Sequence, residues 1–149
     1  MRLLFQIYFK KNIMNTLLQG DATELKCALA FIECGYEISF PYGAHSRYDF
    51  IADVQGKLYK IQVKTCKATE DYLEFECRSS QCKSDGHHAH QAYSENEIDF
   101  FATYCNHKCY LVPVNECSAK KRLRFSLPKN GQTTGINFAK DYEMEEVLK

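Results

Sequence analysis

Residues 48–67, YDFIADVQGKLYKIQVKTCK, are the most strand-like stretch of the chain, because apolar and polar side chains alternate on both sides of Gln55 and Gly56. A polar residue followed by glycine between two alternating runs favours a two-residue hairpin turn. With Gln55 and Gly56 at its centre, Val54 pairs with Lys57, and each outward step pairs the next residue on either side. We therefore expect the chain to fold around an antiparallel hairpin whose register this turn sets.

This register assigns the two faces of the hairpin, since successive strand residues point to opposite sides. One face is apolar and consists of Phe50, Ala52, Val54, Tyr59, Ile61 and Val63. The other face carries Asp49 directly opposite Gln62, with Cβ atoms about 4.5 to 5.5 Å apart. Lys60 shares this face, and Lys64 lies about 6.6 Å beyond Gln62.

The polar face has two interpretations. A carboxylate and an amide oxygen at this spacing suit a hard divalent cation, and a nearby ammonium group can hold a water molecule or offset charge that builds on a phosphate. A half-exposed hairpin with one solvated face produces the same pattern without any site. The hairpin alone leaves both interpretations open.

Apolar residues at helical spacing predict a helix over residues 16–34, with Gly35 in the place of a C-terminal cap. We expect this helix to bury its apolar stripe and to leave Glu24 near one edge. The stripe consists of Leu17, Leu18, Leu25, Ala28, Leu29 and Ile32.

The remaining elements predict a mixed sheet with helices packed on it, an α/β or α+β fold. Residues 78–97 are polar and without periodicity, which indicates a long loop that is either mobile or functional. A closing helix is expected over residues 137–148. Further strands are expected at residues 36–40, 71–77, 98–105, 109–114 and 123–127.

The composition fits one domain without a general affinity for nucleic acid. A chain of 149 residues can bury a core. Nineteen basic residues balance nineteen acidic ones, so a DNA-binding face has to be local. Basic residues gather in two places, although solvated surface charge explains both groups as well. The groups are Lys57, Lys60, Lys64 and Lys67, and Lys120, Lys121, Arg122 and Arg124.

Residues 1–13 share no clear pattern with the sequence that follows, so we expect an N-terminal extension before one domain of residues 14–149, with Met14 as an alternative start. The segment MRLLFQIYFKKN lacks a small-residue cleavage site and is too short to span a bilayer. We therefore expect a cytoplasmic protein, not a membrane protein, with reduced thiols.

Eight cysteines are many for this length, and they suit disulfides, metal ligands or small buried side chains. Structural zinc more often uses shorter paired spacings than those found here, so we expect no structural zinc. The residues considered for it are Cys77, Cys82, His87, His88, His90, Cys105, His107 and Cys109.

An ordered set of motifs resembles the PD-(D/E)XK nuclease superfamily: a glutamate in the first helix, an aspartate that heads a strand, and a (D/E/Q)-x-K triplet on the paired strand. The segments QGDATEL, ECGYEISF, SRYDF and IQVKT are similar to the small group I intron-associated homing endonucleases of this superfamily. The similarity continues through YSENEIDFFATYC, CYLVPV and LRFSLPKNGQTTGINFAKDY. The resemblance implies a restriction-endonuclease-like core and metal-dependent cleavage of DNA.

The resemblance also implies a catalytic cluster of Glu24, Asp49, Gln62 and Lys64. Asp49 and Gln62 would bind Mg²⁺, which Mn²⁺ can replace, with the backbone carbonyl of Val63 as a further ligand. Glu24 would reach the metal or its water from the helix, and Lys64 would position the attacking water.

Two positions depart from the superfamily pattern. Tyr48 stands where proline is usual, which removes a conformational constraint but no ligand. Gln62 replaces an acid, so less negative charge faces the metal. This exchange implies weaker metal binding or one ion in place of two.

Cutting both strands of a duplex implies two copies of the chain, as a homodimer or homotetramer on double-stranded DNA. Two alternatives stay open: a non-catalytic module on the same fold that binds nucleic acid or zinc, and a nuclease of the restriction or repair type. The residues expected to contact DNA are Arg47, Lys67, Arg78, Lys83, Tyr93, Lys120, Lys121, Arg122 and Arg124.

Overall fold

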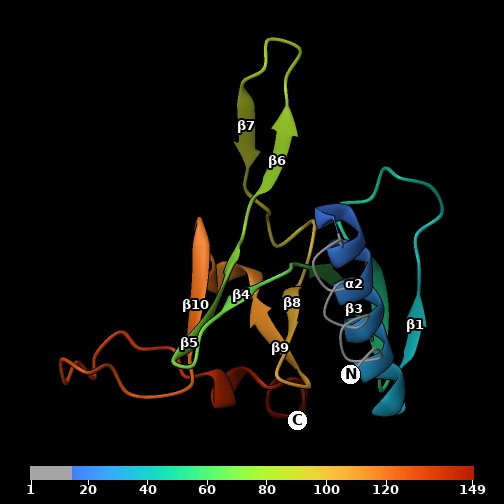
Figure 1. The fold of residues 1–149 in the computed structure, drawn as a ribbon. Helices are drawn as coiled ribbons and strands as arrows, with labels where there is room; N and C mark the ends of the chain where they lie inside the picture. The colour runs from blue at the N-terminus through green and yellow to red at the C-terminus, as the bar shows by residue number, and fades with distance from the viewer. Residues whose placement is uncertain (1–14) are drawn as a thin grey trace, which may run out of the picture.

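The computed structural model describes residues 15–149, so the extension expected at residues 1–13 lies outside the described residues. A five-stranded mixed sheet carries helix α2 on one face, and a three-stranded sheet packs beside it (Figure 1). The main sheet has the order β1-β2-β3-β8-β9, in which only β3 and β8 run parallel. This arrangement confirms the predicted mixed sheet.

The elements alternate between the two sheets along the chain. The helix α2 is Thr16–Glu33, and the main sheet consists of β1 (Glu37–Ser39), β2 (Phe50–Val54), β3 (Lys57–Val63), β8 (Phe100–Cys105) and β9 (Lys108–Pro113). The second sheet has the order β10-β5-β4 and consists of β4 (Lys67–Ala68), β5 (Tyr72–Glu76) and β10 (Lys120–Arg124). A separate two-stranded ribbon consists of β6 (Ser79–Cys82) and β7 (His88–Gln91).

The central hairpin has the predicted register. Val54 pairs with Lys57 and Phe50 with Ile61. Both turn residues have positive φ, 55° at Gln55 and 88° at Gly56, as a type I′ turn requires. The expected apolar face is buried apart from Tyr59, which is partly buried, and Phe50 and Ile61 are fully inaccessible to solvent. The turn chemistry and the alternation therefore fix the strands that carry the candidate site.

Helix α2 has the predicted bounds but packs through a different face. Asn15 caps its start by accepting a hydrogen bond from the Leu18 N–H (2.9 Å), and Gly35 follows its end with φ 84°. The residues buried against the sheet are Thr23, Cys27, Ala28 and Phe31.

The prediction that the leucine stripe of α2 is buried was wrong for five of its six members. Leu17, Leu18, Leu25, Leu29 and Ile32 are all more than half exposed. The small side chains of Thr23, Cys27 and Ala28 let the helix lie close to the sheet, and Phe31 fills the remaining space above β2.

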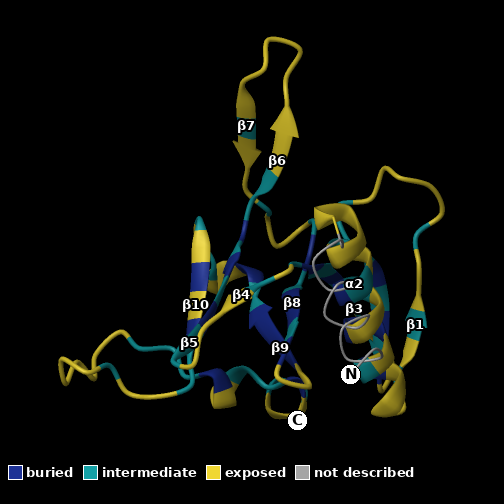
Figure 2. Ribbon diagram, viewed as in Figure 1, coloured by how far each residue is buried: buried dark blue, intermediate teal, exposed yellow. Residues whose placement is uncertain are grey.

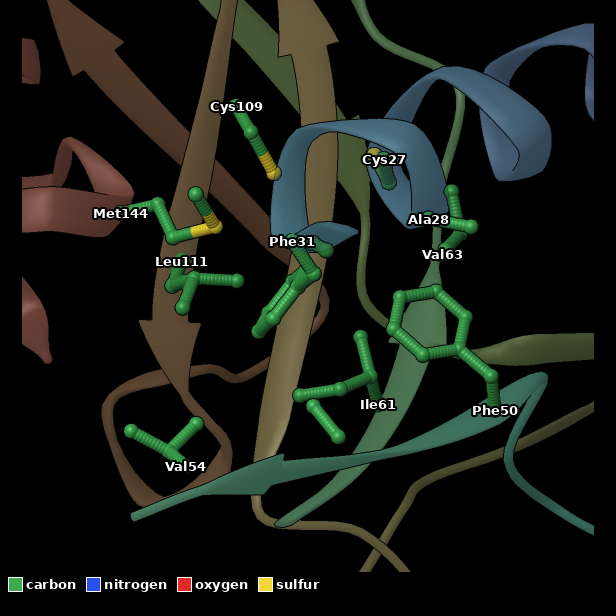
Figure 3. Packing of buried hydrophobic residues seen from close by; sticks show 12 residues of the cluster. Cys27, Ala28, Phe31, Phe50, Val54, Ile61, Val63, Cys109, Leu111 and Met144 are labelled. Atoms are coloured by element: carbon green, nitrogen blue, oxygen red, sulfur yellow. The ribbon is translucent and has the colours of Figure 1, made fainter. Parts of the chain in front are cut away.

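The central strands are the most buried part of the chain (Figure 2), and their side chains form two core clusters, one on each face of the main sheet. The first lies under α2, where Phe31, Phe50 and Ile61 meet (Figure 3). The second lies between the main sheet and the β10-β5-β4 sheet and includes Phe101 and Leu73. The central strands are thus buried on both sides and hold the ends of β2 and β3 in place.

Three elements differ from the sequence predictions. Residues 78–97 contain the β6–β7 ribbon instead of a structureless loop, because a turn centred on Ser84 and Asp85, closed by the Gly86 N–H donating to the Lys83 carbonyl, joins two short pairing segments. The last sheet strand is β10 and lies earlier than residues 123–127, in register with β5.

The expected closing helix is also absent from residues 137–148. It is replaced by a 3₁₀ turn, Ala139–Tyr142, and a single helical turn, α3, Met144–Val147. Extended bridges at Phe138 and Glu143 interrupt helical continuity. Across residues 15–149, no helix has the length and apolar character needed to cross a membrane.

Candidate active site

Asp49 and Gln62 meet at the end of the central hairpin, as the register predicts. The Asp49 N–H donates to the Ile61 carbonyl (2.8 Å), which extends the pairing beyond Phe50. Asp49 Oδ2 accepts hydrogen bonds from the Val63 N–H (2.6 Å) and from Gln62 Nε2 (2.8 Å). The carboxylate is therefore fixed against the end of β3.

The Gln62 amide group lies between two oxygen atoms. Its Nε2 is 2.8 Å from Asp49 Oδ2 and 3.2 Å from the Val63 carbonyl oxygen. An electropositive amide group thus contacts both oxygens that a cation would contact, and a rotation of the amide presents Oε1 in its place. Carboxylate, amide and carbonyl oxygens are ligands suited to Mg²⁺ or Mn²⁺. The donor set fits a hard divalent cation.

Glu24 faces this cluster from α2. Partial burial raises the pKa of Glu24, and the negative charges of Asp49 and Asp21 raise it further. Burial also raises the pKa of Asp49, although the Val63 N–H and the charge of Lys64 act in the opposite direction. The negative charge of each carboxylate makes ionisation of the other less favourable, and a cation bound between them would offset this repulsion.

Two hollows in the surface border the carboxylates. Glu24 and Asp49 line both a cavity of about 330 Å³ beside residues 40–48 and a cavity of about 220 Å³ that Gln62 and Val63 also line. The helix is held to the strand end by the hydroxyl groups of Thr23 and Thr65, which are 3.3 Å apart. The pair of threonines keeps Glu24 near Asp49, and no sequence motif signals it.

Lys64 lies at the same strand end but points toward the base of the ribbon. Its Nζ donates to the Arg78 carbonyl (3.1 Å) and lies 3.5 Å from the Tyr93 hydroxyl and 5.0 Å from the Tyr93 ring centre. Burial lowers the pKa of Lys64, and the charge of Asp49 opposes this shift. Two contacts leave one of the three ammonium donors for a water molecule or a phosphate oxygen.

The sequence profile of the PD-(D/E)XK endonuclease family matches residues 14–145. The chain belongs to this endonuclease family. A solved structure of a bacterial homing endonuclease, I-Ssp6803I, has the same fold, with a TM-score of 0.72 and 21% sequence identity over 91% of this chain and 93% of that chain. No curated protein sequence matches the chain.

Within this PD-(D/E)XK endonuclease, Arg47 links the cluster to the ribbon. Its guanidinium donates to Glu97 (3.0 Å), to the Ser79 hydroxyl (2.8 Å) and to the Ala92 carbonyl (2.9 Å). It also stacks 3.9 Å from the centre of the Tyr93 ring. Arg47 was predicted to contact DNA, but these contacts show that it joins the two strands of the ribbon at its base. Nothing in the sequence identifies Glu97 as its partner.

The basic residues of the endonuclease near the C-terminus do not act as one group. Alternation along β10 puts Lys120, Arg122 and Arg124 on one side, and Arg122 pairs with Glu74 (2.9 Å). Lys121 points to the other side and is buried beside Glu116 (3.3 Å).

The interpretation of Lys121 as a DNA contact is therefore wrong, because its side chain is enclosed. Its ammonium group also contacts Asn137 and Tyr142. Lys67 lies exposed on the same sheet as the accessible basic residues, and Lys83 lies at the ribbon tip. Arg78 pairs with Glu76 (2.7 Å).

The cysteines do not gather at one site, but six of them lie in neighbouring pairs: Cys27 with Cys109, Cys66 with Cys105, and Cys77 with Cys117. Cys105 and Cys109 belong to the two different core clusters, and Cys82 is exposed on the ribbon. All eight thiols are free. In residues 15–149, no group of three or more His, Cys, Asp or Glu side chains is placed to hold a metal ion.

Proposed function

We propose that this chain is a metal-dependent DNA endonuclease that hydrolyses phosphodiester bonds at specific sites, as a homing endonuclease does. The observation that carries the proposal is the convergence of Asp49 Oδ2, the Gln62 amide and the Val63 carbonyl, with Lys64 on the same strand end. Membership of the PD-(D/E)XK endonuclease family and a fold shared with a bacterial homing endonuclease support DNA as the substrate.

The residues have distinct roles in the proposed mechanism. Asp49, Gln62 Oε1 and the Val63 carbonyl would hold Mg²⁺ or Mn²⁺. A cation bound there would supply polarisation of a phosphoryl oxygen and a water molecule of lowered pKa. Glu24 accepts a hydrogen bond from the attacking water and orients it, while Lys64 donates to that water or to the phosphate oxygen on which charge develops.

Recognition of the target is assigned to the β6–β7 ribbon and to the exposed basic side chains of the β10-β5-β4 sheet. The ribbon projects away from the rest of the molecule, near the end at which α2 begins (Figure 1). A two-stranded ribbon fits the major groove of B-DNA, where base edges can be read. Lys120, Arg122 and Arg124 then contact phosphates, which position the duplex without reading it.

The chain is proposed to act as a homodimer or homotetramer, since each copy carries one catalytic cluster. It is also proposed to work in the cytoplasm, where eight free thiols stay reduced. A nuclease of the restriction or repair type would use the same chemistry on other targets.

Metal binding is tested by Gln62→Glu. A second carboxylate beside Asp49 adds negative charge to the ligand set, so Mn²⁺ is expected to bind about tenfold more tightly, which corresponds to about 1.4 kcal/mol. Isothermal titration calorimetry measures the affinity, and plasmid cleavage in Mg²⁺ with and without EDTA measures the requirement for metal.

The matched control is Gln62→Leu, which removes the amide oxygen and is expected to weaken Mn²⁺ binding. Cleavage that continues in excess EDTA contradicts the proposed function. A metal affinity unchanged by both substitutions places the ion elsewhere.

Site recognition is tested by shortening the ribbon. Replacement of residues 82–88 by Asn-Gly joins Gln81 to Ala89, which already pair, and suits a two-residue turn. The contacts of Arg47 to Ser79 and Ala92 are kept. Because each lost base contact is worth about 1–3 kcal/mol, preference for the target over random DNA is expected to fall at least about 100-fold, with metal-dependent cleavage retained.

Sequencing of cleaved products from a random DNA library measures this preference. Lys83→Ala is the control, since loss of one ribbon charge is expected to weaken binding similarly on all sequences. A shortened ribbon that selects the same sites as the intact chain shows that another surface reads the bases.

A further inference from the structure

The side of helix α2 that faces away from the sheet is exposed (Figure 2), and apolar residues form a row along it. We define the α2 seam as Leu18, Ala22, Leu25, Leu29 and Ile32. Its large side chains are between 52% and 63% exposed. Isolated exposed leucines are common, but a continuous row along one helix face marks an interaction surface.

The spacing of the α2 seam indicates what covers it. Its members follow one another at steps of four, three, four and three residues, which is the repeat of two helices packed side by side. The residues that fasten α2 to its own sheet, such as Cys27 and Phe31, lie outside the seam. The helix therefore has one apolar face in its own core and a second apolar face that is exposed.

The charges that flank the seam match a second copy of the same helix in parallel orientation. Asp21 comes directly before Ala22, and Lys26 comes directly after Leu25. In a parallel pair, a residue on one flank faces the residue five positions later on the other helix. Asp21 of each copy thus faces Lys26 of the other copy, and a two-fold axis creates this contact twice.

Both charged side chains are available for such contacts. Among residues 15–149, neither Asp21 nor Lys26 forms an ion pair, and Lys26 only approaches the ring of Tyr104, 5.8 Å from its centre. When two seams pack together, four large side chains of each copy that are now more than half exposed would be removed from water.

We infer that two copies of this chain associate through their α2 seams, with the helices parallel. This arrangement places both Glu24 residues at the same end of the dimer. The inference deepens the proposed function. It rests on that function because cutting both strands of one duplex requires two catalytic clusters. The association itself is measured without DNA, so failure of the two proposals can be told apart.

The test is the molar mass of the full chain in sedimentation velocity over a dilution series, without DNA. The chain is expected to be dimeric, and Leu25→Glu is expected to weaken the dimer at least about 100-fold, because an unpaired charge enters the seam. Leu58→Glu is the matched control, since Leu58 is 62% exposed on β3, and it is expected to leave the dimer intact. Circular dichroism confirms that each variant is folded.

Orientation is tested by charge exchange. Asp21→Lys and Lys26→Asp are each expected to weaken the dimer about tenfold, and the double variant is expected to restore it to within about threefold. Failure of the double variant to recover overturns the parallel arrangement.

Three other outcomes overturn the inference itself. They are a full chain that is monomeric at all concentrations, a Leu25→Glu variant that dimerises as well as the native chain, and a chain that associates only after deletion of residues 1–13. The last result would assign the seam to the chain's own N-terminal segment. A dimer that cuts no DNA overturns the proposed function and leaves this inference standing.

Discussion

Lys64→Ala is expected to lower the rate of DNA cleavage by about 10²–10³-fold, the cost of removing one donor from a developing negative charge. Lys64 is the basic residue of the QxK triplet and interacts electrostatically with Asp49. Because Lys64 is partly buried, water screens its charge less than it screens an exposed charge. DNA affinity is expected to change little, since several basic side chains elsewhere are proposed to contact phosphates. Single-turnover cleavage of a plasmid in Mg²⁺ measures the rate.

The matched control for this prediction is Lys60→Ala. Lys60 lies on the same polar face of β3, but its Nζ donates to the Asn96 carbonyl (2.6 Å), away from the carboxylates. It is expected to retain cleavage within about threefold, a difference of less than 1 kcal/mol. If Lys64→Ala folds and cuts as well as Lys60→Ala, Lys64 has no part in the chemistry.

Folding must be checked for Lys64→Ala, because this lysine also joins the strand end to the Arg78 carbonyl and Tyr93. A Tyr93→Phe variant removes only the hydroxyl contact. It is expected to retain most activity, since the Arg78 carbonyl still holds the ammonium group. The comparison separates the effect of the Lys64 charge on cleavage from the effect of its hydrogen bond to the Tyr93 hydroxyl.

The position of Asp49 beside Gln62 was predictable because local chemistry determines it. A turn at Gln55 and Gly56 sets the register, and the register alone places Asp49 opposite Gln62. The contact between the Gln62 amide and the Val63 carbonyl follows from the same strand. Glu24 was predictable only through the family resemblance, because the packing of α2 on the sheet brings it near Asp49.

Periodicity failed on α2 because the helix has two apolar faces. A row of leucines and a row made of Thr23, Cys27, Ala28 and Phe31 both satisfy helical spacing, and hydrophobicity favours the leucines. The second row is nevertheless the buried one, because its small residues allow the helix to approach the sheet closely. The error has a functional meaning if the α2 seam receives a second copy of the chain.

The ribbon and the Arg47 contacts at its base were missed for another reason. Residues 78–97 are polar throughout, so no apolar alternation indicates strands. Their order depends on Arg47, which is far away in sequence and contacts both ends of the ribbon. Such long-range polar contacts leave no pattern in a single sequence. The same holds for Lys121, whose burial follows from the side of β10 on which it lies.

Phe31→Ala is expected to lower the free energy of unfolding by about 3–5 kcal/mol, a large part of the roughly 5–15 kcal/mol that stabilises a domain. The Phe31 side chain is completely buried and packs edge-on against Phe50, with ring centres 5.4 Å apart. Its loss leaves a cavity between α2 and β2. Urea denaturation measures the free energy, and a thermal melt is expected to shift down by roughly 10 °C.

Leu17→Ala is the matched control, because it lies on the same helix and is 77% exposed. It is expected to change stability by less than about 1 kcal/mol, since alanine favours helix and little apolar contact is lost. Equal destabilisation by the two substitutions would show that α2 packs through its leucines. Because Phe31 and Phe50 hold together the helix with Glu24 and the strand that leads from Asp49, Phe31→Ala should also lose cleavage at a lower temperature than Leu17→Ala does.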